Sequence, residues 1–141
     1  MRTGGRRLKK LLAASMKTEI MLPWPPSVNT YWRMWRSRMV ISKAGREYRA
    51  AVAEQMAEQN AAKFADRPVV VVIRAYRPDK RKRDLDNLLK AALDSLSHAG
   101  VFDDDSQIQD LRIYWGDHIG GYLKVEVTDD LVQPNFVAQR K

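Results

Sequence analysis

Two short segments rich in aspartate are the part of this sequence best suited to chemistry. Asp84 and Asp86 stand two residues apart in RKRDLDNLLK, and the run Asp103-Asp104-Asp105 follows further along the chain. Hydrolysis of a phosphodiester near neutral pH needs an attacking hydroxide and a neutralised leaving group, and Mg²⁺ or Mn²⁺ held by carboxylates supplies both. Where a loop enters a helix, Asp84 and Asp86 can turn to one side and share a metal ion. A third carboxylate from another segment would complete such a site.

Lys90 adds a positive charge to this pattern. It follows Asp86 by four residues, which places both on one helical face, where Lys90 could neutralise a scissile phosphate. The residues alone leave other interpretations open. Asp84 is also a normal helix N-cap, Lys90 could form an ordinary surface ion pair with Asp86, and a run of three aspartates is often a solvated turn.

The chain around these acids is strongly basic. Its 25 Lys and Arg against 17 Asp and Glu give a formal net charge of +8 in 141 residues, which favours a polyanionic partner, most often nucleic acid. The phosphate-binding candidates near the first acidic segment are Arg77, Lys80, Arg81, Lys82 and Arg83. A solvated charged loop is the competing interpretation of this run.

A second basic stretch, residues 31–38, combines aromatic side chains with arginines (YWRMWRSR). Trp32 and Trp35 could stack on exposed bases while Arg33 and Arg36 bind DNA. Packing of both tryptophans in the core or between subunits is the equally open alternative.

The hydrophobic pattern predicts six main elements in the order β-α-β-α-β-β. The predicted strands are 18–22, 69–76, 108–115 and 122–128, and the predicted helices are 44–60, capped by Ser42, and 85–99, ended by Gly100. A four-stranded sheet carrying two helices would bury the apolar face of each helix. The second helix joins the two aspartate-rich segments, so it must position both.

Composition and length exclude several classes of protein. The chain has no cysteine, which excludes a disulfide scaffold and a thiolate zinc site, and no apolar stretch is long enough to span a membrane. The apolar patch LLAA is too short for a secretory signal peptide. We expect one nuclease-like domain over residues 16–130 between a basic arm, 1–15, and an aperiodic tail, 131–141, that we expect to be disordered. The arm is either a nucleic-acid-binding segment or an addition upstream of a start at Met16.

Three blocks in the expected order resemble the RusA family of crossover junction endodeoxyribonucleases: LPWPPSVN, PDKRKRDLDNLLKAALDSL and AGVFDDDSQI. The resemblance covers roughly residues 18–128. It implies that Asp84, Asp86 and Asp105 hold the catalytic metal, with Asp104 as the alternative third ligand, and that Lys90 is the catalytic lysine of the block.

The resemblance further implies an α+β subunit with a mixed sheet, a homodimer, and Mg²⁺ as cofactor with Mn²⁺ substituting. The implied substrate is a four-way (Holliday) junction cut by paired nicks in DNA recombination and repair. We expect a cytoplasmic protein that associates with the nucleoid when bound to DNA and has no membrane partner. A non-catalytic basic nucleic-acid-binding module and a nuclease that prefers flaps or forks remain the alternatives.

Overall fold

A computed structural model of the chain describes residues 15–132. The basic arm, apart from its last residue, and the tail from residue 133 onward lie outside the described residues. Among the helices that are described, none combines the length and hydropathy needed to cross a bilayer.

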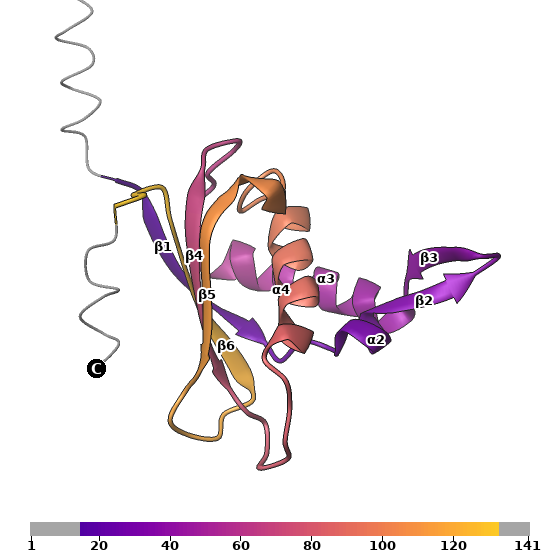
Figure 1. Cartoon of the computed structure of the whole chain (residues 1–141). Coiled ribbons are helices and arrows are strands. Elements are labelled where there is room, and N and C mark those ends of the chain that lie inside the picture. The colour runs from indigo at the N-terminus through magenta and orange to yellow at the C-terminus, as the bar shows by residue number, and fades with distance from the viewer. Residues whose placement is uncertain (1–14, 133–141) are drawn as a thin grey trace, which may run out of the picture.

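The four long strands form one mixed sheet in the order β1-β6-β4-β5 (Figure 1). β1 (Lys17–Pro23) pairs antiparallel with β6 (Tyr122–Thr128), and β6 pairs antiparallel with β4 (Val69–Tyr76). β4 in turn pairs in parallel with β5 (Ile108–Trp115). The bounds predicted for the last three strands are confirmed, as is the α+β class with a mixed four-stranded sheet.

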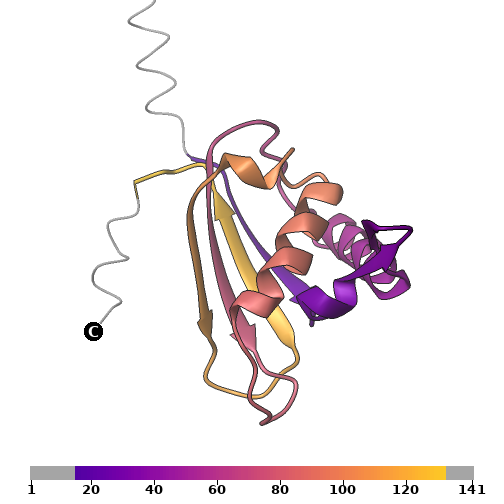
Figure 2. The ribbon, with the colours of Figure 1, turned by 45° about the vertical axis from the view of Figure 1, so that its right-hand side comes forward.

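Both long helices, α3 (Lys43–Glu58) and α4 (Asp86–His98), cover the same face of the sheet (Figure 2). Both helices begin and end within two residues of the predicted bounds. Ser42 caps α3 by accepting a hydrogen bond from the Gly45 amide, and Gly100 ends α4 with φ +84°, as predicted. α4 is the crossover that joins the parallel strands β4 and β5, so it must lie across the sheet.

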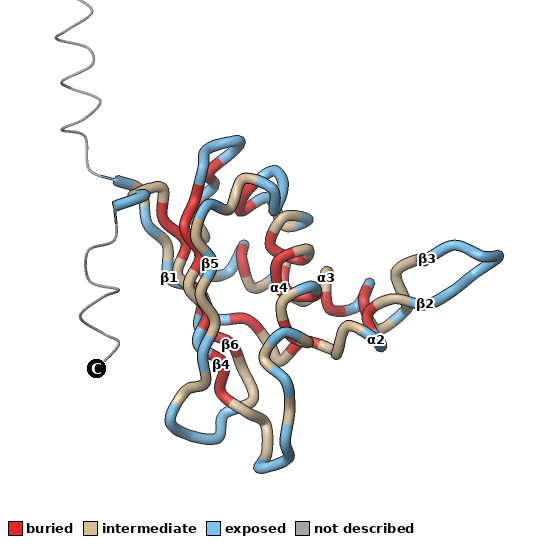
Figure 3. Tube along the Cα trace, in the orientation of Figure 1, coloured by how far each residue is buried: buried red, intermediate tan, exposed pale blue. Residues whose placement is uncertain are grey.

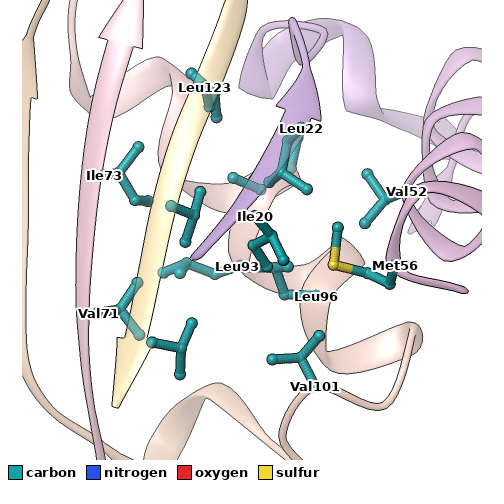
Figure 4. Packing of buried hydrophobic residues seen from close by; sticks show 14 of the residues in the cluster. Ile20, Leu22, Val52, Met56, Val71, Ile73, Leu93, Leu96, Val101 and Leu123 are labelled. Atoms are coloured by element: carbon teal, nitrogen blue, oxygen red, sulfur yellow. The ribbon is translucent and has the colours of Figure 1, made fainter. Parts of the chain in front are cut away.

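The core lies between this helical layer and the sheet (Figure 4). Alternate strand residues such as Ile20, Ile73 and Val125 face the helices and are fully buried, while the intervening residues lie on the other face of the sheet, where many but not all are exposed. α3 contributes a stripe of residues spaced four apart: Tyr48, Val52 and Met56. α4 contributes the larger apolar surface: Leu88, Ala91, Ala92, Leu93 and Leu96.

The sequence pattern missed several short elements between β1 and α3 and after α4. One turn of helix, α2 (Val28–Tyr31), leads into a hairpin made of β2 (Trp32–Trp35) and β3 (Arg38–Ile41), which projects from the body (Figure 1). A 3-10 turn, η1 (Asp105–Gln107), precedes β5. Strands of four residues carry too little periodicity to detect, and the hairpin turn Arg36-Ser37 lacks the usual Asn-Gly signal.

A polar cluster fixes these short elements to the two long helices. Arg49 on α3 donates hydrogen bonds of 2.8 and 2.6 Å from Nε and Nη2 to one carboxylate oxygen of Asp94 on α4. The hydroxyl of Tyr31, the last residue of α2, donates to the same oxygen. Burial, and then the neighbouring Asp94 carboxylate, raise the pKa of Tyr31. The cluster therefore holds α2, α3 and α4 at one point.

We expect Asp94→Ala to lower the free energy of unfolding by about 2 kcal/mol, because it leaves the partly buried Arg49 and the fully buried Tyr31 without their acceptor. Denaturant unfolding monitored by circular dichroism measures the change. Glu47→Gln is the control, since it removes an exposed ion pair with Lys43 and should cost about 0.5 kcal/mol or less. An equal loss in both variants would show that the cluster contributes no more than a surface pair.

Candidate active site

A cleft of about 500 Å³ lies at the N-terminus of α4, where the proline-rich segment after β1 meets the basic loop after β4. The proline-rich segment supplies Trp24, Pro25 and Ser27. The basic loop and the first turn of α4 supply the other lining residues: Lys82, Arg83, Asp84, Asn87 and Leu88. Two segments that are almost sixty residues apart in sequence thus form one site around Asp84.

The carboxylates of Asp84 and Asp86 are available for a ligand. The N-cap position of α4 is Leu85, the helix has no side-chain cap, and Asp84 contributes only its backbone carbonyl, which accepts from the Asn87 amide at 3.3 Å. The N-cap interpretation of Asp84 is therefore wrong. Both side chains are exposed, and neither forms a hydrogen bond or ion pair with another residue among 15–132.

Two arginines and two tryptophans form a stacked column beside the site, in the order Arg83, Trp24, Trp115 and Arg77. The rings of Trp24 and Trp115 stack with centroids 6.5 Å apart. The guanidinium of Arg83 lies 5.8 Å from the Trp24 centroid, and that of Arg77 lies 3.8 Å from the Trp115 centroid. Such contacts hold planar groups parallel and restrict their motion. Trp24, which lies between two prolines, is partly buried and anchors this loop on the core.

The basic loop is held in shape by Asp79, which sequence reasoning overlooked. Asp79 accepts from Arg83 at 2.5 and 3.0 Å and from Arg81 at 3.2 and 3.1 Å. The hydrogen bonds from Arg83, and then those from Arg81, hold the pKa of Asp79 well below its usual range. Asp79 and Arg83 have the four-residue spacing of an opposite-charge pair, which was the available signal.

These contacts divide the five phosphate-binding candidates of the loop into two groups. Arg77, Arg81 and Arg83 each have a partner within the protein, whereas Lys80 and Lys82 are exposed and make no ion pair in the described part of the chain. The two lysines are therefore the groups that can bind a phosphate without first losing an internal contact.

Lys90 lies one turn into α4 on its exposed side. Its Nζ atom is 5.8 Å from the centroid of the Trp32 ring, and no ion pair with Asp86 is present within residues 15–132. The ion-pair interpretation is therefore wrong. Lys90 also lies close enough to the acidic loop to affect Asp104. Hydrogen bonding from Ser106 lowers the pKa of Asp104, and the charge of Lys90 adds to the effect.

The acidic loop uses its three aspartates differently. Asp104 caps η1: its carboxylate accepts from the Ser106 amide at 3.0 Å, while the Gln107 side chain accepts from the Asp104 amide at 2.9 Å. Asp103 contributes backbone contacts to Ala65 and Ser97. The Asp105 carboxylate is exposed and forms no side-chain hydrogen bond to another described residue. Asp105 is thus better suited than Asp104 to be a ligand.

The two acidic segments are not gathered into one cluster within this chain. Among residues 15–132, no group of three or more Asp, Glu, His or Cys side chains is close enough to hold a metal ion. The donor set nevertheless fits a hard divalent cation, because Asp84, Asp86 and Asp105 all offer exposed carboxylate oxygens that have no other partner among these residues.

The chain is similar in sequence to a set of DNA-cleaving enzymes. A family model described as endodeoxyribonuclease RusA matches residues 23–128, which contain the whole cleft and the acidic loop. The crossover junction endodeoxyribonuclease of Enterobacteria phage HK97 is 41% identical over 112 residues, covering 79% of this chain and 93% of the phage protein. That of Escherichia coli K12 is 41% identical over 111 residues, covering 78% and 92% respectively.

We expect Asp104→Ala to accelerate hydrogen exchange at the Ser106 amide several-fold, because the acceptor that caps η1 is removed. Asp104→Asn should preserve slow exchange, since asparagine caps about as well as aspartate. Exchange followed by nuclear magnetic resonance measures both. Fast exchange in Asp104→Asn as well would mean that the charge of Asp104, and not its acceptor oxygen, organises the loop.

Proposed function

This chain belongs to the RusA family of endodeoxyribonucleases, and we propose that it cleaves four-way DNA junctions at a site formed by Asp84, Asp86 and Asp105. The observation that supports this site best is the exposed Asp84 carboxylate, which has no partner among residues 15–132 and lines a cleft together with the basic Lys82 and Arg83. A structural aspartate would cap the helix or pair with an arginine, and Asp84 does neither.

The residues of the chain have separable roles in this proposal. Lys80 and Lys82 attract the DNA backbone to the cleft. Asp84, Asp86 and Asp105 would hold Mg²⁺, with Mn²⁺ as a substitute; when bound, the ion supplies Lewis-acid assistance to phosphodiester hydrolysis. Lys90 neutralises negative charge that develops on the scissile phosphate. Trp24 helps to position Arg83, which lines the cleft with it, and Trp115 stacks behind Trp24 and contacts Arg77.

A symmetric homodimer would explain why the carboxylates are separated in one chain. The thirteen residues of α4 span roughly 20 Å, and the acidic segments stand before and after it. In a twofold dimer, the acidic loop of one protomer can approach the Asp84–Asp86 segment of its partner. Two such composite sites would cut two opposing strands, as a four-way junction requires.

We expect Asp84→Asn, Asp86→Asn and Asp105→Asn each to reduce junction cleavage by orders of magnitude, because each removes an anionic ligand at nearly constant volume. Junction affinity should hold or rise, since one carboxylate no longer repels the phosphates. Single-turnover cleavage in saturating Mg²⁺, with binding measured in Ca²⁺, separates the two effects. Lys90→Ala should likewise lose cleavage and keep its fold.

Asp103→Asn is the matched control, because Asp103 is equally exposed and its backbone alone makes hydrogen bonds. It should cleave like the unmodified protein. Near-normal cleavage by both Asp84→Asn and Asp86→Asn would contradict the metal site and favour a non-catalytic DNA-binding module. Faster cleavage of flaps or replication forks than of four-way junctions would instead change the assigned substrate.

We expect a mixture of Asp84→Asn and Asp105→Asn proteins to regain nicking activity after subunit exchange. If sites are shared across a dimer, each mixed dimer contains one site with all three carboxylates intact. If each site lies within one protomer, every site of the mixed dimer carries one substitution and stays inactive. Light scattering should give twice the chain mass, and a monomer that still makes paired nicks would refute the dimer.

A further inference from the structure

The hairpin of β2 and β3 is a largely exposed element, and the proposed site does not use its outer part. Its base is fixed: Trp32 and Ile41 pack against the core, and the Ser42 hydroxyl donates to the Thr30 carbonyl at 2.5 Å. A β-carbon at Gly45 would come within 2.6 Å of the Tyr31 carbonyl oxygen, so α3 packs directly beneath the base. Beyond this base, residues 33–39 are exposed (Figure 3).

The two faces of the hairpin differ in chemistry. Met34 pairs with Met39 across the strands, which puts both methionines on one face with exposed fractions of 62% and 60%. Trp35 pairs with Arg38 on the other face and is 44% exposed. The guanidinium of Arg36 lies 4.6 Å from the Trp35 ring centroid. One face thus presents an aromatic ring between two arginines.

The turn indicates that the arginine at the tip is not there for stability. Arg36 and Ser37 have φ of +48° and +62°, the left-handed region that two-residue hairpin turns normally fill with Asn and Gly. Arginine is strained there, and such strain at an exposed tip points to a use for the side chain. The turn is therefore less stable than an Asn-Gly turn would be, and it places a positive charge at the tip of the hairpin.

Charge identifies the kind of partner. Residues 32–46 contain four arginines and a lysine without a single acidic residue, and Arg33, Arg36 and Arg38 make no ion pair with any other described residue. A second copy of the hairpin would bring one set of arginines against another. The exposed apolar groups, two methionines and one tryptophan, are also far too few for a stable protein interface of about 800 Å² per partner. A polyanion with accessible flat rings fits both the positive charge of the hairpin and its small exposed apolar surface.

We propose that this hairpin reads the DNA branch point: Trp35 stacks on a base left exposed where the duplex arms meet, and Arg33, Arg36 and Arg38 bind the flanking phosphates. Only the single turn α2 separates the hairpin from the proline-rich segment that lines the cleft, and Trp32 at its base contacts Lys90. DNA held at the cleft therefore passes the hairpin. In a linear duplex every base is stacked, so Trp35 would find no partner there.

The inference rests on the proposed function only for the choice of a branched substrate, so its test uses binding and not cleavage. Binding of a four-way junction and of a linear duplex with the same sequences is measured in EDTA for the unmodified protein, Trp35→Ala, Trp35→Phe and Met39→Ala. We expect Trp35→Ala to weaken junction binding about tenfold and duplex binding less than about twofold, because the stacking contact is lost. Trp35→Phe should restore most of the junction affinity, and Met39→Ala, equally exposed on the opposite face, should bind normally.

A fluorescent base analogue at the crossover gives an independent signal, since stacking by Trp35 quenches it and Trp35→Ala should not. The inference is overturned if Trp35→Ala weakens junction and duplex equally, or not at all. It is also overturned if light scattering shows that Trp35→Ala dissociates a dimer, because the hairpin then serves a second copy of this chain. If Asp84→Asn loses cleavage while Trp35→Ala binds the junction normally, the proposed nuclease function stands and only the proposed role of the hairpin is rejected.

Discussion

The packing of α4 against the sheet is the constraint on which the rest of the structure depends. Leu88, Ala92 and Leu96 are buried on one side of this helix, so the register of the helix is fixed by the hydrophobic effect. That register decides what faces outward: Asp86 and Lys90 at the N-terminal end, and Asp94 towards α3. A rotation by one residue would expose leucines and bury charges, which is far more costly than any single polar contact.

Contacts within the protein hold several arginines near the cleft, so the number of positive charges overstates how many groups can bind a phosphate. Asp79 holds Arg81 and Arg83, while Trp24 and Trp115 hold Arg83 and Arg77 against their rings. Arg83 lines the cleft, and Lys80 and Lys82, which make no ion pair among residues 15–132, are the proposed binding groups beside it. A site arranged in this way loses little side-chain entropy when a phosphate arrives, because only the lysines must be ordered.

Two features of the molecule sacrifice local stability. The N-cap position of α4 is Leu85, which has no side-chain acceptor although Asp84 and Asp86 flank it, and the hairpin turn places Arg36 and Ser37 in left-handed backbone. Both positions would be more stable with other residues, a short polar residue in place of Leu85 and Asn-Gly at the turn. Departures from locally favourable sequence are expected where function depends on particular side chains. The two places are the proposed metal site and the proposed branch reader.

The sequence by itself determined the four long strands, the two long helices, the Ser42 and Gly100 helix ends, and the placement of acids at both ends of α4. These follow from periodicity and from caps, which are properties of neighbouring residues. The motifs also indicated the family.

The sequence could not show that Asp79 binds the arginines of the basic loop, or that residues 32–41 form a projecting hairpin. It also could not show that Asp104 caps η1 while the Asp105 carboxylate makes no contact with another described residue. Only the tertiary structure decided these points, together with the choice of one sheet face for both helices. The physical reason is that each depends on contacts or backbone angles with no periodic signature: Trp24 meets Trp115, and Tyr31 meets Asp94, only after the chain has folded.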